Sequence, residues 1–151
     1  MELRSASEPG VPLGLALIEG EGQTIEFMEG MPANARELAK EIAAFSTSND
    51  GSIFLGVRDD GSICGLPGME TPPQRDALVS RVAGIASGAV QPAAAISLSF
   101  KVHEGSVVAR VFVHKGHHPV YFASNVPYVR HLDQSRPAGP DEVQALYRRS
   151  S

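Results

Sequence analysis

The sequence predicts a single domain of the mixed α+β class, in which helices alternate with β-hairpins. Three observations support this prediction. The chain has 151 residues, which is long enough for one domain with its own apolar core. Some segments repeat apolar residues at helical spacing, whereas others alternate apolar and polar residues as strands do. The 15 glycines and 11 prolines indicate many turns between short elements.

Three segments carry the apolar stripe of a helix that packs on a core. The first spans residues 34–45 and starts with Asn34, in the pattern of a capping box. The second spans residues 71–88, and its Pro72 fits the first helical position because the donor it lacks is not needed there. The third starts at Gly139. The residues expected to face inward are Leu38, Ile42, Phe45, Leu78, Val82, Ile85, Val143, Leu146 and Tyr147.

The remaining apolar segments are predicted to be strands. They span residues 24–27, 52–57, 62–66, 96–102, 107–113 and 126–131. The segment 52–57 is almost continuously apolar, which is typical of a buried central strand. Residues 59–61 (Asp-Asp-Gly) and 104–105 (Glu-Gly) predict the turns of two hairpins. Residues 13–18 fit either a helical turn or a strand.

Composition and charge exclude several classes of protein. With 42% hydrophobic and 20% charged residues, the chain is neither mainly disordered nor fibrous. The single Cys64 excludes an intramolecular disulfide and a multi-cysteine zinc site. No apolar run approaches the roughly 20 residues of a membrane span. The net charge of −4 argues against a strong general affinity for nucleic acid, but it permits a local basic patch.

The N-terminus has no feature of a secretion signal. Its first ten residues include acidic side chains and no apolar stretch, so we expect a cytoplasmic protein without a signal peptide. Residues 1–12 are polar enough to predict a flexible tail before a domain over 13–149.

Carboxylates form the first candidate site. Glu21 and Glu26 flank a short extended segment, and Asp59 or Asp60 follows the predicted central strand. If these side chains converge, their oxygens suit Mg²⁺ or Mn²⁺. Such ions can polarise a phosphodiester and activate water. The alternative is that all of these acids are solvated on the surface.

Basic residues of the C-terminal half form the second candidate site. Arg130 and Arg136 flank Ser135, and Tyr121, Phe122 and Tyr128 are near in the sequence. Arginine combined with hydroxyls and aromatic rings suits phosphate contacts and base stacking, although ordinary salt bridges and core aromatics are an equal alternative. Lys115 lies in the loop of residues 114–118 (His-Lys-Gly-His-His) and can also reach a phosphate. This loop has too few ligands for zinc, so we interpret it as a polar loop.

Motifs for nucleotide and acyl chemistry are absent from the sequence. The chain has no phosphate-binding P-loop and no dinucleotide fingerprint, so we expect no ATP binding. It also lacks the Gly-x-Ser-x-Gly pattern of a triad hydrolase.

Four sequence segments together resemble one known family. They are EGQTIEF, AFSTSNDGSIFLGVRDDGSICGL, HPVYF and YVRHLDQSRPAGPDEVQAL, and they occur in the order and spacing of the Schlafen AlbA-like domain. The resemblance extends from about Leu15 to Leu146. It implies a curved, mostly antiparallel sheet with hairpins, flanked by about three helices, and a function in binding nucleic acid, RNA more than DNA.

The resemblance also implies residue roles. In the Schlafen nucleases, three carboxylates and a divalent metal cleave RNA, and these acids correspond to Glu21, Glu26 and Asp59, or Asp60 in a shifted register. Two lobes form the basic cradle of those enzymes, so a chain with one lobe is expected to form a homodimer. Met28 stands where the family usually has lysine, which favours the alternative of a non-catalytic interaction or regulatory module.

Overall fold

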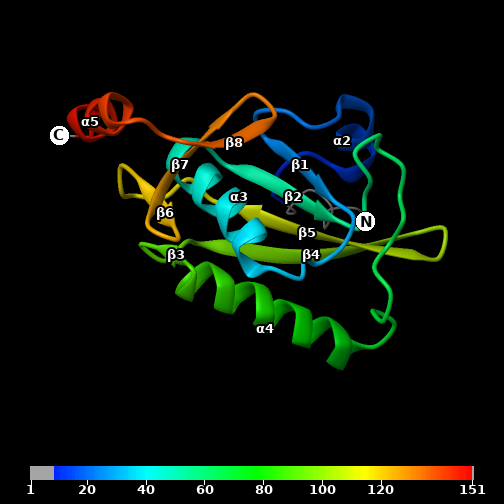
Figure 1. Cartoon of the computed structure of the whole chain (residues 1–151). Helices are drawn as coiled ribbons and strands as arrows, with labels where there is room; N and C mark the ends of the chain where they lie inside the picture. The colour runs from blue at the N-terminus through cyan, green and yellow to red at the C-terminus, as the bar shows by residue number, and fades with distance from the viewer. Residues whose placement is uncertain (1–8, 151) are drawn as a thin grey trace.

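The α+β class is confirmed by the computed structural model, which describes residues 9–150 (Figure 1). Within this range the helices are α2 (Leu13–Glu19), α3 (Ala35–Ser48), α4 (Pro72–Gly88) and α5 (Pro140–Arg149). The strands are β1 (Ile25–Met28), β2 (Gly51–Leu55), β3 (Val90–Gln91), β4 (Ile96–His103), β5 (Ser106–Val113), β6 (Tyr121–Ala123), β7 (Val126–His131) and β8 (Gln134–Pro137). They form two four-stranded sheets instead of the one sheet that the resemblance implies.

The first sheet has the strand order β1-β2-β5-β4. β1 runs parallel to β2, and the other neighbours are antiparallel. Every residue of β2 is buried, and β2 lies between two neighbours, so the predicted central strand is confirmed. The predicted hairpin of β4 and β5 is confirmed as well.

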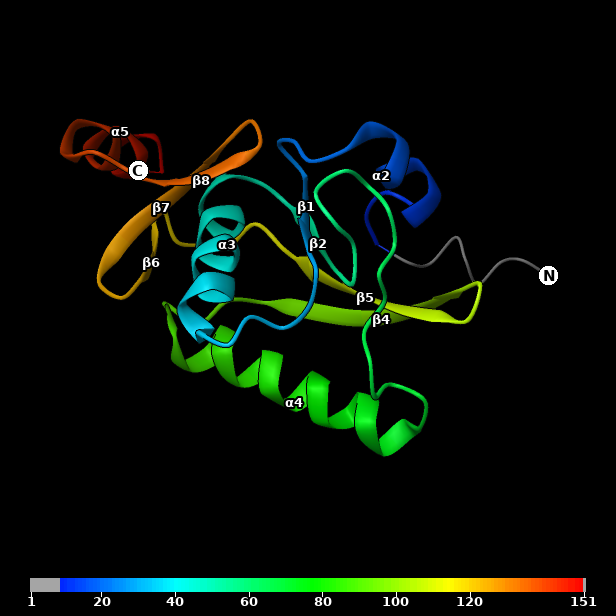
Figure 2. The same cartoon turned by 45° about the vertical axis from the view of Figure 1, so that its right-hand side comes forward.

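The second sheet has the order β3-β6-β7-β8 and is antiparallel throughout. Of its strands, only β7 was predicted, because the other three are too short to show a clear alternation. Helix α3 packs against β6 and β7 and also contacts β5, so it joins the two sheets (Figure 2). The last turns of α3 are therefore within reach of both sheets.

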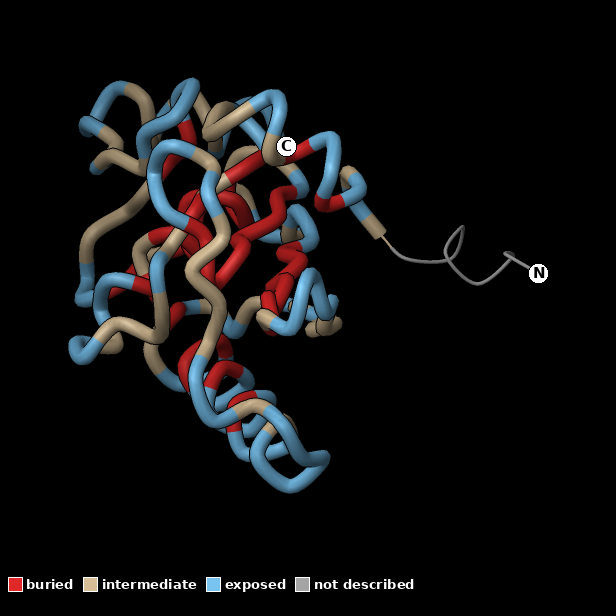
Figure 3. Tube along the Cα trace, turned by 90° about the vertical axis from the view of Figure 1, so that its right-hand side faces the viewer, coloured by how far each residue is buried: buried red, intermediate tan, exposed pale blue. Residues whose placement is uncertain are grey.

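Two groups of apolar side chains form the core. The larger group contains the predicted stripes of α3 and α4, which are buried together with residues of β2 and β5. The smaller group lies under α2, where Leu13 and Ala16 pack against Phe27 and Phe54. Figure 3 shows that buried residues gather where α3 meets the strands, whereas the far end of α4 is mostly exposed. The run 13–18 therefore forms a helix, not a strand.

Two expected features differ from the structure. No residue of α5 is fully buried: Val143 and Leu146 are half-buried, whereas Tyr147 is 48% exposed, so the predicted inward orientation is wrong for Tyr147. Residues 62–66 form no regular strand, and a single bridge joins Val57 and Ile63. Gly61 and Gly65 both have positive φ angles (88° and 76°), which interrupts the extended backbone that a longer ladder requires.

The predicted tail over residues 1–12 lies partly outside the described residues, which begin at Pro9. The Pro9 carbonyl accepts a hydrogen bond from Arg110 Nη1 at 2.6 Å, and Val11 packs on the smaller core. Among the described residues, no helix combines the length and the apolar character needed to cross a membrane.

A pair of glycine substitutions tests the contact between α3 and β2. A Cβ at Gly51 would overlap the Phe45 ring, so we expect Gly51→Ala to lower the free energy of unfolding by about 1–3 kcal/mol. A Cβ at Gly84, inside α4, meets no atom within 4 Å. We therefore expect Gly84→Ala to raise the stability by up to about 1 kcal/mol. Urea unfolding measures both, and a Gly51→Ala variant as stable as the wild type would contradict the close packing.

Candidate functional site

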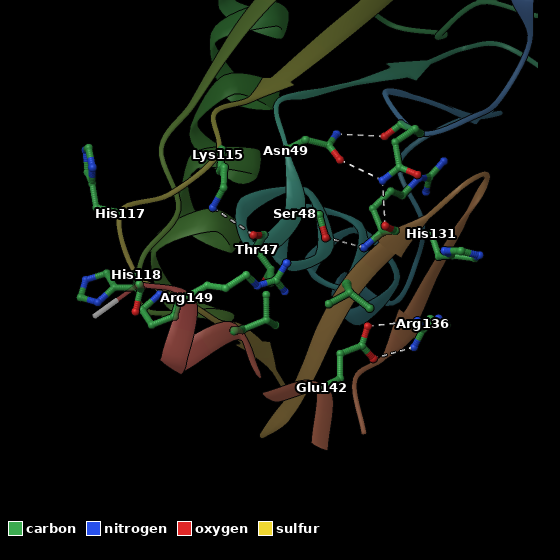
Figure 4. Close-up of a pocket in the computed structure, with 16 residues that line it drawn as sticks. Thr47, Ser48, Asn49, Lys115, His117, His118, His131, Arg136, Glu142 and Arg149 are labelled. Carbon is green, nitrogen blue, oxygen red and sulfur yellow. Dashed lines mark hydrogen bonds and ion pairs between the residues drawn. The ribbon is translucent and has the colours of Figure 1, made fainter. Parts of the chain in front are cut away.

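A polar cleft of about 440 Å³ lies among the end of α3, the loop before β6, the β7–β8 hairpin and α5 (Figure 4). Its basic and histidine side chains are Lys115, His117, His118, Arg130, His131, Arg136 and Arg149. Figure 4 shows Lys115, His117 and His118 on one side of the cleft and His131 and Arg136 on the other. Three of the predicted nucleic-acid-binding residues, Lys115, Arg130 and Arg136, therefore border the same cleft.

The end of α3 fixes the loop that carries Lys115. The Gly116 N–H donates to the Ser46 carbonyl at 2.8 Å, and the Lys115 N–H donates to Asp50 Oδ1 at 2.7 Å. The Lys115 ammonium donates to the Thr47 carbonyl at 3.2 Å. Such carbonyls at the last turn of a helix have no partner within the helix, and a cation there also complements the helix dipole. A Cβ at residue 116 would overlap the Tyr121 side chain, so glycine is the residue that fits at this position.

Several residues of the cleft were not predicted. They are Gln23, Thr47, Ser48, Asn49, His117, His118, His131, Glu142 and Arg149. The predicted helix ends at residue 45, because the apolar stripe does not continue beyond it. Instead α3 continues to Ser48, and its polar side chains hold the neighbouring strands. The Thr47 hydroxyl accepts a hydrogen bond from the Tyr121 N–H at 2.8 Å, and the Ser48 hydroxyl accepts one from the Arg130 N–H at 2.9 Å.

Arg130 lies behind the cleft wall, and its side chain is fully buried. Its Nη1 donates to Glu26 at 2.8 Å and to Glu41 at 3.1 Å, and its Nη2 donates to the carbonyls of Gly22 at 2.8 Å and Ile25 at 2.9 Å. Its Nε donates to the carbonyls of Gly22 and Leu132, each at 3.1 Å. The guanidinium also lies over the Phe45 ring, 4.8 Å from its centroid.

The burial of Arg130 corrects the expectation that this residue contacts a phosphate. All three nitrogens of its guanidinium already donate to the protein, so none faces a ligand. Ser135 also turns inward. Its hydroxyl accepts from Arg130 Nη1 at 3.0 Å and makes a short hydrogen bond to Glu41. Both residues build the wall of the cleft and do not line its open side.

Two carboxyl groups share the single positive charge of Arg130. Burial, reinforced by the nearby charge of Glu41, raises the pKa of Glu26 to about 8. Burial also raises the pKa of Glu41. Because a buried charge without compensation is costly, the cluster retains a proton at neutral pH.

The acids that were predicted to bind metal are engaged separately. Glu21 Oε2 accepts the Phe27 N–H at 3.0 Å, Glu26 faces Arg130, and Asp60 Oδ1 accepts the N–H and the hydroxyl of Ser62. Asp59 is exposed in the turn. Across residues 9–150, no three His, Cys, Asp or Glu side chains are arranged to hold a metal ion. The arrangement therefore does not fit Mg²⁺ or Mn²⁺ shared by Glu21, Glu26 and Asp59 or Asp60.

Arg136 and Glu142 join β8 to α5 at the edge of the cleft. Two hydrogen bonds of 2.9 Å and 3.1 Å connect the guanidinium to the carboxylate. They raise the pKa of Arg136 and lower the pKa of Glu142. Arg149, two turns of helix further along α5, has no ion-pair partner in the described part of the chain. The cleft therefore presents a partly neutralised Arg136 and an unpaired Arg149.

Removal of the Arg130 side chain tests its structural role. We expect Arg130→Ala to lower the free energy of unfolding by about 3–5 kcal/mol, because two buried carboxyl groups lose their partner. The matched control is Arg136→Ala, which breaks a partly exposed, solvent-screened pair and should lower the free energy of unfolding far less. Urea unfolding compares the two variants, and equal losses would argue against the buried cluster.

The raised pKa of Glu26 predicts a dependence of stability on pH. The folded state holds a proton at Glu26 up to about pH 8, whereas the unfolded chain releases it near 4.5. This contribution is complete below pH 4.5 and is lost as the pH rises through 8. We therefore expect the melting temperature to fall as the pH rises from 4.5 to about 8. Glu26→Gln should flatten this decline, whereas Glu37→Gln, on the exposed side of α3, should retain it.

Comparison with known proteins places the chain in a family. The sequence model of the family described as Schlafen, AlbA_2 matches residues 21–139. The fold is similar to that of the DIP2311 protein from Corynebacterium diphtheriae, with a TM-score of 0.59 and 23% identity. That similarity covers 85% of this chain and 24% of the other, so this chain spans about a quarter of that protein.

A second solved structure supports the same fold. It is the N-terminal domain of a RecG-related protein from Nitrosomonas europaea, with a TM-score of 0.57 and 19% identity over 84% of this chain and 90% of that domain. No curated protein matches the chain. The family match covers more than half of the sequence and agrees with the observed fold. This chain therefore belongs to the Schlafen AlbA_2 family.

Proposed function

We propose that the cleft binds nucleic acid, RNA in preference to DNA, through contacts to phosphate groups. One observation carries this proposal. In a chain with a net charge of −4, Lys115, Arg136, Arg149 and three histidines gather around one cleft. Local positive charge of this kind attracts phosphates even where the whole protein is acidic.

The chemistry of the wall supports a polyanionic ligand. Lys115 and Arg149 supply charged donors, and Ser48, Asn49 and Gln23 add hydroxyl and amide groups between them. Most hydrogen bonds between proteins and nucleic acids go to phosphates and sugars and use these residue types. The resemblance to the Schlafen AlbA-like domains independently implies a nucleic-acid ligand.

Two substitutions test the proposal. Lys115→Ala and Arg149→Ala should each weaken binding to RNA and to duplex DNA regardless of sequence. Each should also reduce the slope of log affinity against log salt by about 0.7–0.9, because one phosphate contact fewer releases fewer counterions. Fluorescence anisotropy at several salt concentrations measures both quantities.

The matched control is Arg81→Ala. Arg81 lies on α4, and its Nη2 donates to the Pro32 carbonyl at 3.5 Å, outside the cleft. This variant has the same change in net charge and should retain the wild-type affinity and slope. If Arg81→Ala weakened binding as much as Lys115→Ala, overall charge and not the cleft would explain binding.

Binding without cleavage is the form of the proposal that the geometry favours. Glu26 is held by Arg130, and Asp60 is held by Ser62, so these acids already have partners. The non-catalytic module is therefore preferred to the metal-dependent endoribonuclease. A homodimer, the arrangement that would combine two clefts, is part of the same proposal.

A metal titration separates the two functions. For a binding module, we expect Mn²⁺ to leave the melting temperature unchanged and the protein to leave transfer RNA intact, because no ion is bound only by the folded state. The nuclease is established instead if Mn²⁺ raises the melting temperature, supports cleavage that EDTA abolishes, and does neither with Glu26→Gln. Incubation with labelled RNA and a thermal scan measure both effects.

A further inference from the structure

An exposed leucine occupies the tip of the β7–β8 hairpin. His131 pairs with Gln134, so the turn between them contains only Leu132 and Asp133. Leu132 has a φ angle of 58° and is 62% exposed. Turns of two residues usually place glycine, asparagine or aspartate at positions with positive φ.

This placement lowers the stability of the folded protein. A residue with a Cβ loses roughly 1–2 kcal/mol in the left-handed region. The other described non-glycine residues with positive φ are polar ones, namely Glu104, Ser124 and Asn125. Because Leu132 is mostly exposed, it gains little from burial in return. Neither folding nor solubility explains an apolar side chain here, and strained residues of this kind cluster at functional sites.

The backbone of Leu132 is held on both sides. Its N–H donates to Gln23 Oε1 at 2.7 Å, and its carbonyl accepts from Arg130 Nε at 3.1 Å. Gln23 Nε2 in turn donates to Asn49 Oδ1 at 2.9 Å and to the Arg130 carbonyl at 2.8 Å. The buried arginine therefore also positions the exposed leucine.

Leu132 stands at the rim of the cleft. Its neighbour His131 and its partner Gln23 both line that cleft, and Arg136 lies on the next strand. A side chain at this place is next to the path of a polynucleotide that extends from the proposed phosphate-binding residues. Proteins use rigid apolar side chains beside such contacts to pack against bases that have left the stack.

We propose that Leu132 packs against the face of an unstacked base while the cleft holds the neighbouring phosphates. This inference rests on the proposed function. It names the substrate class, which is nucleic acid that has unpaired nucleotides next to a double-stranded segment. A protein partner fits less well, because one apolar side chain among cations and histidines is far smaller than a stable protein interface.

The test uses two fluorescein-labelled RNA hairpins, one with a single-stranded 3′ tail and one with a blunt end. We expect the wild type to bind the tailed hairpin more tightly. Leu132→Asn, in which asparagine tolerates the positive φ, should lower that affinity by about tenfold, since the contact of one buried leucine is lost. The Leu132→Asn variant should keep the wild-type affinity for the blunt hairpin and the wild-type salt slope. Its melting temperature should not fall below that of the wild type.

Two further variants make the result specific. Leu132→Met keeps an apolar side chain and should keep the preference for the tailed hairpin. Val102→Asn removes another exposed apolar side chain, 60% exposed, on the β4–β5 hairpin, which projects at the right of Figure 1, apart from the β7–β8 turn at the top. It should bind both hairpins as the wild type does.

The outcomes separate this inference from the proposed function. A Leu132→Asn protein that is stably folded and binds the tailed hairpin with wild-type affinity overturns the inference and leaves phosphate binding intact. Equal losses on both hairpins also overturn it, because Leu132 would then not distinguish unpaired bases. Absence of binding by the wild type to either RNA overturns the proposed function itself.

Discussion

The guanidinium of Arg130 connects more parts of this fold than any other described side chain. It joins the carbonyls before and within β1, two carboxyl groups from β1 and α3, the β7–β8 turn and the ring of Phe45. The first sheet, the second sheet and the helix between them therefore meet at one buried charge. Without it, the carboxyl groups of Glu26 and Glu41 would be buried with no cation beside them, which costs more than the pair contributes when intact.

The same cluster determines the geometry of the proposed binding surface. Arg130 cannot reach a ligand, yet it holds the carbonyl of Leu132, and its own N–H is held by Ser48 at the end of α3. The positive charge at the cleft comes instead from Lys115 and Arg149, which line it. These two residues lie on elements that surround the buried Arg130 cluster. A substitution of Arg130 would therefore weaken binding by loss of the fold, so stability must be measured beside affinity.

The division between a charged interior and a basic cleft is what would allow an acidic chain to bind a polyanion, as proposed above. The acids nearest to the cleft are engaged: Glu26 and Glu41 with Arg130, and Glu142 with Arg136. The loop of Lys115, the histidines and the end of α5 line the open cleft. Because α5 has no buried residue and an ion pair connects it to β8, this wall of the cleft is the one held least by packing.

Residue patterns alone were enough to predict the α+β class, the helices α3 and α4 with their buried stripes, the central strand β2 and the β4–β5 hairpin. These elements are long, and burial of one face leaves a clear periodicity in the residues. The sequence also suggested Lys115 and Arg136 as phosphate-binding residues, because a positively charged side chain in a polar segment can be identified from the residue type alone. The three-dimensional packing was needed to show that Arg130 and Ser135 turn inward and that Glu21, Glu26 and Asp59 are engaged separately. It likewise decided that Gln23, Ser48, His131 and Arg149 share a cleft. Burial and hydrogen bonding between residues about a hundred positions apart, as between Gly22 and Arg130, depend on how the two sheets pack, and local sequence contains no record of that packing.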